Sequence, residues 1–224
     1  MKRVLASVNV SAVKSLEIDG ESVPTGIFKE PVSGRVALRG VNVAGDDQGD
    51  RSVHGGPDRA TYVYAAEDYA WWEGELARAL PPGMFGENLT VRGLDVSNAR
   101  IGEQWQIGTA LVQVTSPRVP CFKLAAKMND PKIVKKFARA LRPGAYLRIV
   151  TEGDLGAGDA ITVVSRPDHD LTVAAMTAMC SSSTRVHANY SSPKSPRAGA
   201  RGSKSKRVNA EACSCENAVV CAPA

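Results

Sequence analysis

The chain has 224 residues, and 43% of them are hydrophobic, a proportion typical of a globular protein with a sizeable core. No apolar run of about 18 residues occurs, and no apolar segment follows the basic start of the chain, so we expect neither a membrane span nor a secretory signal. Residues 1–170 carry 21 Lys and Arg against 21 Asp and Glu, whereas residues 171–224 carry 7 against 2. The net charge of +5 therefore lies in the tail, and specific nucleic-acid binding by the body is not expected.

The cysteines are distributed as unevenly as the charge. Cys121 is the only cysteine before Cys180, and three more follow in the tail, at Cys213, Cys215 and Cys221. A body with one thiol is not a disulfide scaffold, which indicates a reducing compartment and predicts a cytoplasmic protein. The tail cysteines lack the spacing of a zinc site, so no metal is expected there.

Short strands separated by turns are predicted from the start of the chain. Val4, Ala6, Val8 and Val10 alternate with other residues over positions 2–10, which predicts a strand that buries the face carrying these four side chains. A second strand is predicted over residues 36–43, before the turn residues that begin at Gly45.

Residues 45–60 form a long polar segment before the predicted strand 61–64. The segment is dense in groups that bind ligands: Arg51, His54, Gly55, Gly56 and Arg59. Loops longer than about 12 residues without structure of their own are usually functional or disordered. We favour a functional loop; the alternative is a solvated connector with a surface histidine.

A helix is predicted over residues 66–80. Tyr69, Trp72, Leu76 and Leu80 recur at helical spacing, so Trp72 is interpreted as a core residue, and the sequence Pro81-Pro82-Gly83 ends the helix. Glu87 and Asn88 follow between apolar residues, where they either cap a turn or point into a pocket.

The stretch 116–124 surrounds Cys121, the one cysteine of the body. It follows a predicted hairpin over residues 103–115, and Pro117 and Pro120 restrict the backbone around Cys121. The nearby charges of Arg118 and Lys123 favour the thiolate form of Cys121. Such a cysteine is suited to act as a nucleophile or as a ligand of a soft metal; the alternative is a buried cysteine that acts as a small hydrophobic residue.

The remaining body is predicted as a helix over residues 131–141, a strand over 145–151, a turn over 153–158 and a last strand over 161–165. Val134, Phe137 and Leu141 define the apolar face of that helix. Many short strands and few helices indicate a mainly β protein, a barrel that is either closed or partly open. Residues 171–179 begin another helix, and the Ser-, Lys- and Arg-rich segment 181–224 is predicted to be disordered.

The residue types and their spacing suit some chemistries better than others. Cys121 with His54 would suit a thiol hydrolase, but no spacing supports that pairing, and the glycine spacing of dinucleotide or P-loop sites is absent. Arg51, Arg59 and Arg118 together suit an anionic ligand, while a thiolate suits a thiophilic metal.

Five motifs in this order resemble one known family. They are Thr25-Gly26-Ile27-Phe28-Lys29, Val53-His54-Gly55-Gly56-Pro57-Asp58-Arg59-Ala60, Phe85-Gly86-Glu87-Asn88-Leu89-Thr90, Pro117-Arg118-Val119-Pro120-Cys121-Phe122-Lys123-Leu124 and Gly144-Ala145-Tyr146-Leu147-Arg148. Together they resemble MOSC-domain proteins, specifically the bacterial YiiM-like group, over about residues 1–175.

The resemblance implies a MOSC-type β-barrel over residues 1–170 that binds the molybdenum cofactor, with Cys121 as the metal ligand and catalytic residue. It implies reduction of N-hydroxylated compounds, including N-hydroxylated purine bases and amidoximes, with electrons from a separate flavoprotein. The cofactor-binding residues that it implies are Lys29, Arg51, His54, Gly55, Gly56, Arg59, Glu87, Asn88, Arg118 and Arg148. It also carries a family-level association with pyridoxal phosphate binding.

The C-terminus departs from this group, which carries a small three-helix domain after the barrel. Here only residues 171–180 look like its start, and residues 181–224 are either a native extension or the product of a frame shift. Two alternative functions stay open: a sulfur carrier with a persulfide on Cys121, and a non-catalytic domain that binds the cofactor. The oligomeric state, monomer or dimer, is not determined by the sequence.

Overall fold

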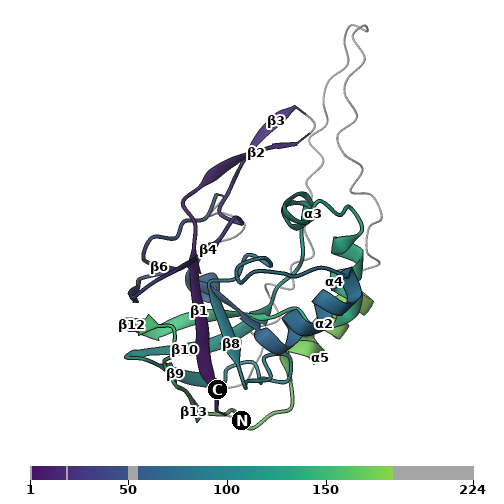
Figure 1. Ribbon diagram of the computed structural model, residues 1–224. Helices are drawn as coiled ribbons and strands as arrows, with labels where there is room; N and C mark the ends of the chain where they lie inside the picture. Colours follow the sequence, from purple (N-terminus) through teal and green to yellow (C-terminus); the bar gives the residue numbers. More distant parts are fainter. Residues whose placement is uncertain (1, 19, 50–54, 184–224) are drawn as a thin grey trace, which may run out of the picture.

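The computed structural model describes residues 2–18, 20–49 and 55–183 (Figure 1). The strands within these ranges are β1 (Val4–Val10), β2 (Lys14–Ile18), β3 (Glu21–Thr25), β4 (Glu30–Val32), β5 (Arg35–Arg39), β6 (Asn42–Val43), β7 (Thr61–Ala65), β8 (Leu89–Arg92), β9 (Gln104–Ile107), β10 (Ala110–Pro117), β11 (Ala145–Thr151), β12 (Gly153–Gly156) and β13 (Ile161–Ser165). The helices are η1 (Pro57–Arg59), α2 (Ala66–Leu76), α3 (Phe122–Met128), α4 (Ile133–Ala140) and α5 (Val173–Ser183). The prediction of a mainly β protein is confirmed.

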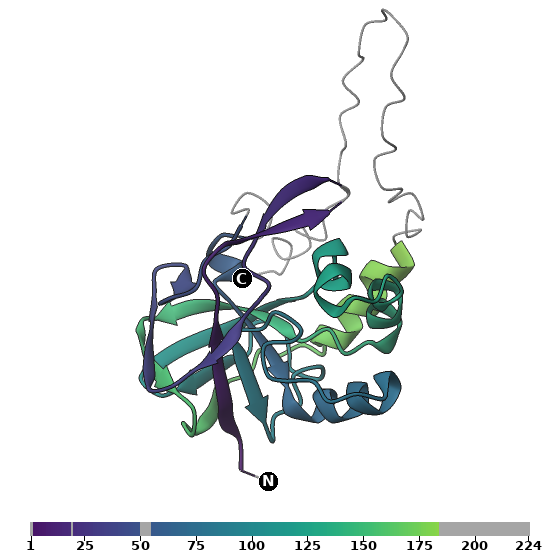
Figure 2. The same cartoon turned by 45° about the horizontal axis from the view of Figure 1, so that its top comes forward.

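One eight-stranded sheet forms the body of the protein, in the order β13-β9-β10-β11-β7-β8-β1-β4. All its pairs are antiparallel except β7 with β8, which are parallel because α2 crosses between them. Two smaller sheets accompany it, β12-β5-β6 and the hairpin β2-β3. In Figures 1 and 2 the helices gather on one side of the large sheet, and the hairpin projects away from it at the end where α3 lies.

The closed form of the expected β-barrel is not found among the described strands, which form an open sheet whose edge strands are β13 and β4. The sheet curls far enough for β1 to reach the segment before β13. The Leu5 amide donates to the Asp159 carbonyl at 2.9 Å, and the Gly158 amide donates to the Leu5 carbonyl at 2.8 Å. These contacts form only an isolated bridge, Val4 with Ala160, because the rest of β1 is already paired with β8 and β4.

The predicted buried face of the first strand is wrong. The pairing of β1 with β8 shifts register between Leu5 and Ser7, which is a β-bulge that leaves Ala6 without a partner. Ala6 is therefore exposed, whereas Leu5, Ser7, Val8 and Asn9 are all buried. Simple alternation could not reveal this, since one extra residue exchanges the two faces of a strand.

Both predicted helices of the body end earlier than expected. The helix predicted over 66–80 stops at Leu76 because Ala77 adopts a left-handed conformation, yet Leu80 still reaches the core. The helix predicted over 131–141 spans Ile133–Ala140, and Leu141 is left-handed and 41% exposed. In addition, part of the predicted turn 153–158 is strand β12, which pairs with β5.

Two hydrophobic clusters hold the fold together. The first lies within the curled sheet and includes Leu5, Trp105 and Leu147, and α5 joins it through Val173. The second is aromatic and lies between the sheet and helices α2, α3 and α4. Its centre is formed by residues that are at most 1% exposed, Tyr64, Trp72, Phe85 and Phe137, so the interpretation of Trp72 as a core residue is confirmed.

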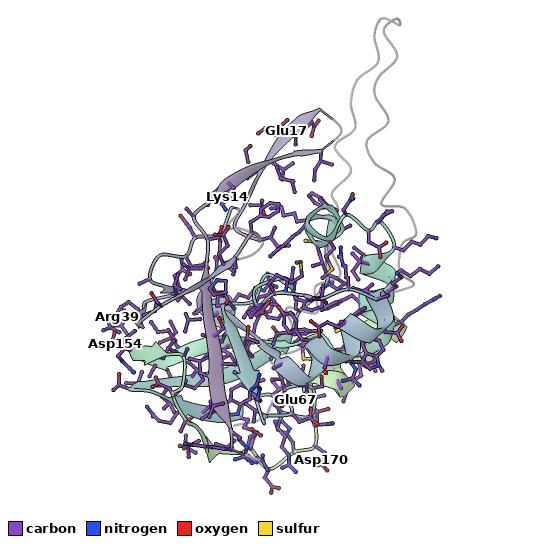
Figure 3. All side chains as sticks on the ribbon, viewed as in Figure 1. Lys14, Glu17, Arg39, Glu67, Asp154 and Asp170 are labelled. Atoms are coloured by element: carbon purple, nitrogen blue, oxygen red, sulfur yellow. The ribbon has the colours of Figure 1, made fainter. Side chains whose placement is uncertain are left out.

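The surface carries exposed charge pairs. Figure 3 labels Lys14 and Glu17 on the projecting hairpin, and Arg39 and Asp154 where β5 meets β12. Arg39 and Asp154 approach to 3.2 Å with about half of each side chain exposed, so this pair contributes little stability. Among the described residues, no helix is both long and apolar enough to cross a membrane.

Some predictions concern residues beyond the described ranges. Arg51 and His54 lie outside them, as do residues 184–224 with Cys213, Cys215 and Cys221. The predicted helix start at 171–180 corresponds to α5, which spans Val173–Ser183. The boundary placed after residue 170 stays a prediction.

The packing of the aromatic cluster predicts that substitution of Phe137 destabilises the protein much more than substitution of Leu141. Phe137 is 1% exposed and stacks on Trp72 with ring centroids 5.8 Å apart, whereas Leu141 is 41% exposed. Phe137→Ala should lower the free energy of unfolding by about 3–5 kcal/mol through the cavity that it creates. Leu141→Ala should change it by less than about 0.5 kcal/mol. Urea denaturation measures both, and equal effects would contradict this packing.

Candidate functional site

A cavity of about 90 Å³ opens beside Cys121. Its walls come from segments far apart in the sequence: residues 25–29, residues 46–49, the turn at 86–88 and the stretch 118–123. Arg59, Tyr62 and Tyr146 complete the lining. This volume holds several water molecules or one tetrahedral anion. A ligand as large as a pterin is too big for this volume, so only part of the ligand would fit inside the cavity.

Cys121 stands between a strand and a helix. Strand β10 ends at Pro117, and Cys121 is the extended residue that precedes α3, with φ −127°. The Leu124 amide donates to the Cys121 carbonyl at 3.0 Å, which holds the turn. The Cys121 thiol is free, partly exposed and part of the cavity lining. The alternative of a fully buried core cysteine is therefore excluded.

Arg118 is a buried cation in the same cavity. It is 7% exposed, its Nη1 donates to the Phe85 carbonyl, and its guanidinium lies 4.9 Å from the centre of the Tyr62 ring. None of the carboxylates in the described part of the chain forms an ion pair with it. A guanidinium has five N–H donors, and none of those on Arg118 is taken by a carboxylate of the described residues.

The turn before β8 is shaped to receive Arg118. Gly86 has φ +76°, and a Cβ atom there would lie 2.9 Å from Ile27 Cγ1 and 3.3 Å from Arg118 Nη1. Glycine is therefore required both by the backbone conformation and by the close approach of the guanidinium.

Glu87 supports this turn from behind and is not part of the cavity lining. Its Oε1 accepts hydrogen bonds from the Tyr69 hydroxyl at 2.5 Å, the Gly83 amide at 2.7 Å and the Thr90 hydroxyl at 2.8 Å. The side chain is fully buried, and burial raises its pKa. The sequence left two alternatives for Glu87, a residue that caps a turn or one that points into a pocket. These hydrogen bonds favour the first.

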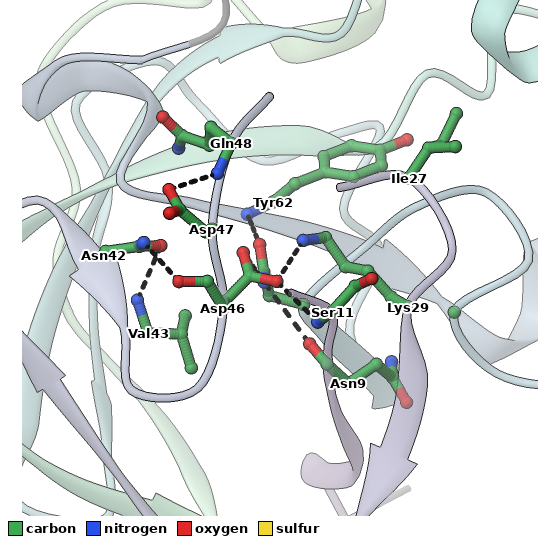
Figure 4. Close-up of polar contacts among 12 residues, drawn as sticks. Asn9, Ser11, Ile27, Lys29, Asn42, Val43, Asp46, Asp47, Gln48 and Tyr62 are labelled. Carbon is green, nitrogen blue, oxygen red and sulfur yellow. Dashed lines mark hydrogen bonds and ion pairs between the residues drawn. The ribbon is translucent and has the colours of Figure 1, made fainter. Parts of the chain in front are cut away.

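Asp46 connects four parts of the site, as Figure 4 shows. Its Oδ1 accepts hydrogen bonds from the Ser11 amide at 2.9 Å and from Lys29 Nζ at 2.5 Å. Its Oδ2 accepts one from Asn88 Nδ2 at 2.9 Å, and its own carbonyl accepts one from Asn42. Asn88 in turn accepts the Tyr62 amide at 3.1 Å. The carboxylate thus aligns β1, β7, β8 and the wall at residue 29.

Two loops form one wall by direct backbone contact. A Cβ atom on Gly26 would lie 2.0 Å from the Asp47 carbonyl oxygen, and one on Gly49 would lie 2.3 Å from the Pro24 carbonyl oxygen. Lys123 Nζ donates to the same Pro24 carbonyl at 3.0 Å. Helix α3 is thereby joined to the base of the projecting hairpin.

The structure brings together five of the residues that the sequence proposed. Lys29, Arg59, Asn88, Arg118 and Cys121 all line the cavity. Lys29 is already paired with Asp46; burial lowers its pKa, and the Asp46 carboxylate opposes that shift.

The other proposed residues that the structure describes are not part of the cavity lining. Arg148 Nε donates to Asp58 Oδ1 at 2.6 Å, which fastens η1 to β11. Gly56 precedes η1 with φ +100°, and a Cβ atom there would meet no atom within 4 Å. Neither Gly55 nor Gly56 is part of the cavity lining.

Sequence reasoning missed several lining residues, notably Asp46, Tyr62 and Tyr146. Tyr62 and Tyr146 sit in predicted strands, where they resemble ordinary core residues. Asp46 follows a glycine, where it resembles an ordinary turn residue. The described residues contain no group of three or more His, Cys, Asp or Glu side chains that could hold a metal ion. The association with pyridoxal phosphate stays a family-level prediction.

The buried ion pair of Asp46 and Lys29 predicts that Asp46→Ala strongly destabilises the protein. Both side chains are at most 8% exposed, so Asp46→Ala leaves a buried ammonium without its partner. We expect a loss of about 3–5 kcal/mol in the free energy of unfolding, measured by urea denaturation. The double variant Asp46→Ala with Lys29→Met should recover part of this loss, and a double variant less stable than the single one would contradict the charge explanation. Glu30→Ala, at an exposed pair with Lys14, is the control and should change little.

Lys127 predicts a pH dependence of stability. Its Nζ donates to the carbonyls of Ile27 at 2.7 Å and Gly83 at 2.5 Å, and burial lowers its pKa from 10.5 to about 8. Between these two values the unfolded chain binds more protons than the folded protein, so the contribution of Lys127 to stability increases as the pH rises. Lys127→Met should therefore reduce the slope of unfolding free energy against pH in this window.

The slope is measured by urea denaturation at several pH values between about 8 and 10. Lys135→Met removes a lysine from the exposed side of α4 and serves as the matched control. Equal slopes for the wild-type protein and Lys127→Met would contradict the prediction.

Comparison with known proteins agrees with this geometry. The MOSC domain family model matches residues 50–162. The uncharacterized protein YflK of Bacillus subtilis is 41% identical over 167 residues, which cover 75% of this chain and 76% of YflK. The crystal structure of YiiM from Geobacillus stearothermophilus has a TM-score of 0.65 and 31% identity, and the match covers 80% of this chain and 83% of that one.

A third relative is longer than this chain. A protein of Gibberella moniliformis named Reductase is 32% identical over 172 residues, which cover 73% of this chain and 30% of that protein. The family model includes the part of the cavity lining that runs from Arg59 to Tyr146, but not the walls at residues 25–29 and 46–49. The chain therefore belongs to the MOSC domain family.

Proposed function

We propose that this chain is a molybdenum-cofactor-dependent oxidoreductase that reduces N-hydroxylated compounds, such as N-hydroxylated purine bases and amidoximes, with electrons from a separate flavoprotein. Membership of the MOSC family supports binding of the cofactor, and the relative named Reductase supports reductive chemistry. One observation carries the proposal: a free thiol and a buried guanidinium without a carboxylate partner among the described residues line the same cavity.

The residues of the cavity fit the cofactor in their chemistry. A thiolate is a soft ligand suited to a thiophilic metal, and Cys121 is the one thiol in the lining. Arg118 and Arg59 supply positive charge to an anionic ligand, with Arg118 able to form two parallel hydrogen bonds. Cys121 would hold the metal, and Arg118, Arg59 and Lys123 would face the anionic groups. The cofactor would supply the transfer of two electrons.

The protein contributes position and charge to this reaction. The net change adds two electrons and two protons to the N–OH group, which leaves an N–H group and releases one water molecule. The Asp46 carboxylate keeps the walls of the cavity in register, and the stacked side chains of Arg118 and Tyr62 hold its floor. A site held in this way needs little rearrangement when substrate binds.

Cys121→Ala tests the proposal. In protein produced by a host that makes the cofactor, we expect wild-type protein to contain molybdenum, measured by mass spectrometry of the metal, and to reduce a model amidoxime. Cys121→Ala should reduce that activity to background. Its midpoint of unfolding should stay close to that of the wild-type protein, since the thiol is small and partly exposed. Cys180→Ala, at the other cysteine of the described residues, is the matched control and should remain active.

Two outcomes of this experiment would overturn the proposal. One is a folded wild-type protein without molybdenum. The other is a wild-type protein that gains the mass of one sulfur atom on Cys121 after exposure to a cysteine desulfurase and yet reduces nothing, which would indicate a sulfur carrier. The flavoprotein donor, the cytoplasmic location and the state as monomer or dimer stay predictions.

A further inference from the structure

Tyr146 differs from Tyr62, Tyr64 and Tyr69 in what its hydroxyl contacts. The Tyr62 hydroxyl donates to the Pro143 carbonyl at 2.6 Å, that of Tyr64 to the Arg142 carbonyl at 2.8 Å, and that of Tyr69 to Glu87 Oε1 at 2.5 Å. The Tyr146 hydroxyl forms no hydrogen bond with any residue that the structure describes, although Tyr146 lines the cavity together with Cys121. The Tyr146 side chain is only partly buried and lines the cavity, so its hydroxyl is accessible to a ligand there.

The backbone holds Tyr146 in a fixed place. Tyr146 lies on β11, opposite Ser116 of β10 and Tyr62 of β7. Its carbonyl accepts the Thr115 hydroxyl at 3.0 Å, and its ring packs on the Tyr62 ring with centroids 5.4 Å apart. A side chain on a central strand, packed on both sides, is positioned more firmly than one on a loop.

The charges around Tyr146 suit a group that gives up a proton and recovers it. Burial raises the pKa of the Tyr146 hydroxyl, so the phenol is protonated at neutral pH. Arg118 and Arg59 oppose this shift, because their positive charges stabilise the phenolate; Cys121 acts in the other direction. The guanidinium of Arg59 lies 5.9 Å from the centre of the Tyr146 ring. The hydroxyl is thus protonated at rest, and the two arginines offset part of the cost that burial imposes on its conjugate base.

We propose that Tyr146 is a catalytic residue of this site, whose hydroxyl donates the proton that the departing oxygen of an N-hydroxylated substrate needs. This inference rests on the proposed function. As the N–O bond breaks, two electrons from the external flavoprotein donor enter the substrate, and the Tyr146 proton passes to the hydroxyl oxygen, which leaves as water. A second proton from solvent completes the N–H group, and a third restores the phenol. The substrate class is therefore one whose leaving oxygen must be protonated.

Tyr146→Phe removes only the hydroxyl oxygen and tests this role. We expect the molybdenum content to be that of the wild-type protein and kcat for an amidoxime to fall by about a hundredfold or more, the usual contribution of a positioned acid. The matched control is Tyr64→Phe, which loses a hydroxyl that donates to Arg142 outside the cavity lining and should retain its kcat.

Two further measurements separate proton donation from a structural role. The O-acetyl derivative of the same amidoxime releases acetate, which needs no proton, so Tyr146→Phe should reduce it nearly as fast as the wild-type protein. In calorimetry without an electron donor, Tyr146→Phe should bind the amidoxime a few-fold more weakly, because one hydrogen bond is lost, and bind the amidine product equally well.

The outcomes distinguish this inference from the proposed function. A wild-type protein that reduces no amidoxime overturns both. An active wild-type protein whose Tyr146→Phe variant keeps its kcat overturns the role of Tyr146 alone. Equal losses of kcat with the amidoxime and its O-acetyl derivative also overturn it, since they would reflect a general disturbance of the site.

Discussion

The site depends first on the buried carboxylate of Asp46. It binds the end of β1 through Ser11, the wall of the cavity through Lys29 and the start of β8 through Asn88. Each of these partners belongs to a segment with little regular structure at that point, so backbone pairing alone would not set their relative positions. A buried charge of this kind stabilises only when all its partners are present. The same contacts therefore position the cavity and make it sensitive to substitution.

A second constraint is how the cations of this region are paired. Lys29 pairs with Asp46, Arg142 with Asp68, and Arg148 with Asp58. Arg118 instead lies on the Tyr62 ring and donates to one carbonyl, with no carboxylate partner among the described residues. An uncompensated guanidinium in a buried position favours an incoming anion. Cys121 lies three residues further along the chain, so the charge that attracts a ligand and the thiol that would bind it share one turn.

Parts of the fold could be read from local patterns. The hairpin β9-β10, the Cys121 turn and strands β7 and β11 lie close to where the pattern placed them. The β-bulge at Ala6, the left-handed residues Ala77 and Leu141 and the open edge of the sheet could not, since each results from contacts between distant segments. Glu87 shows the same limit at the site: its residue type suggested a ligand, and only its three hydrogen bonds revealed that it holds a turn.

The sequence by itself determined the mainly β class and the family, and it selected Cys121 and Arg118 as candidate site residues, because local motifs carry these features. Only the tertiary structure decided which side chains share the cavity. Asp46, Tyr62 and Tyr146 reach it from separate strands and loops, and pairing across the curled sheet brings them within contact of residues far away in the chain. No periodicity encodes such neighbours, since they follow from how the sheet curls and from which backbone groups a buried carboxylate can bind.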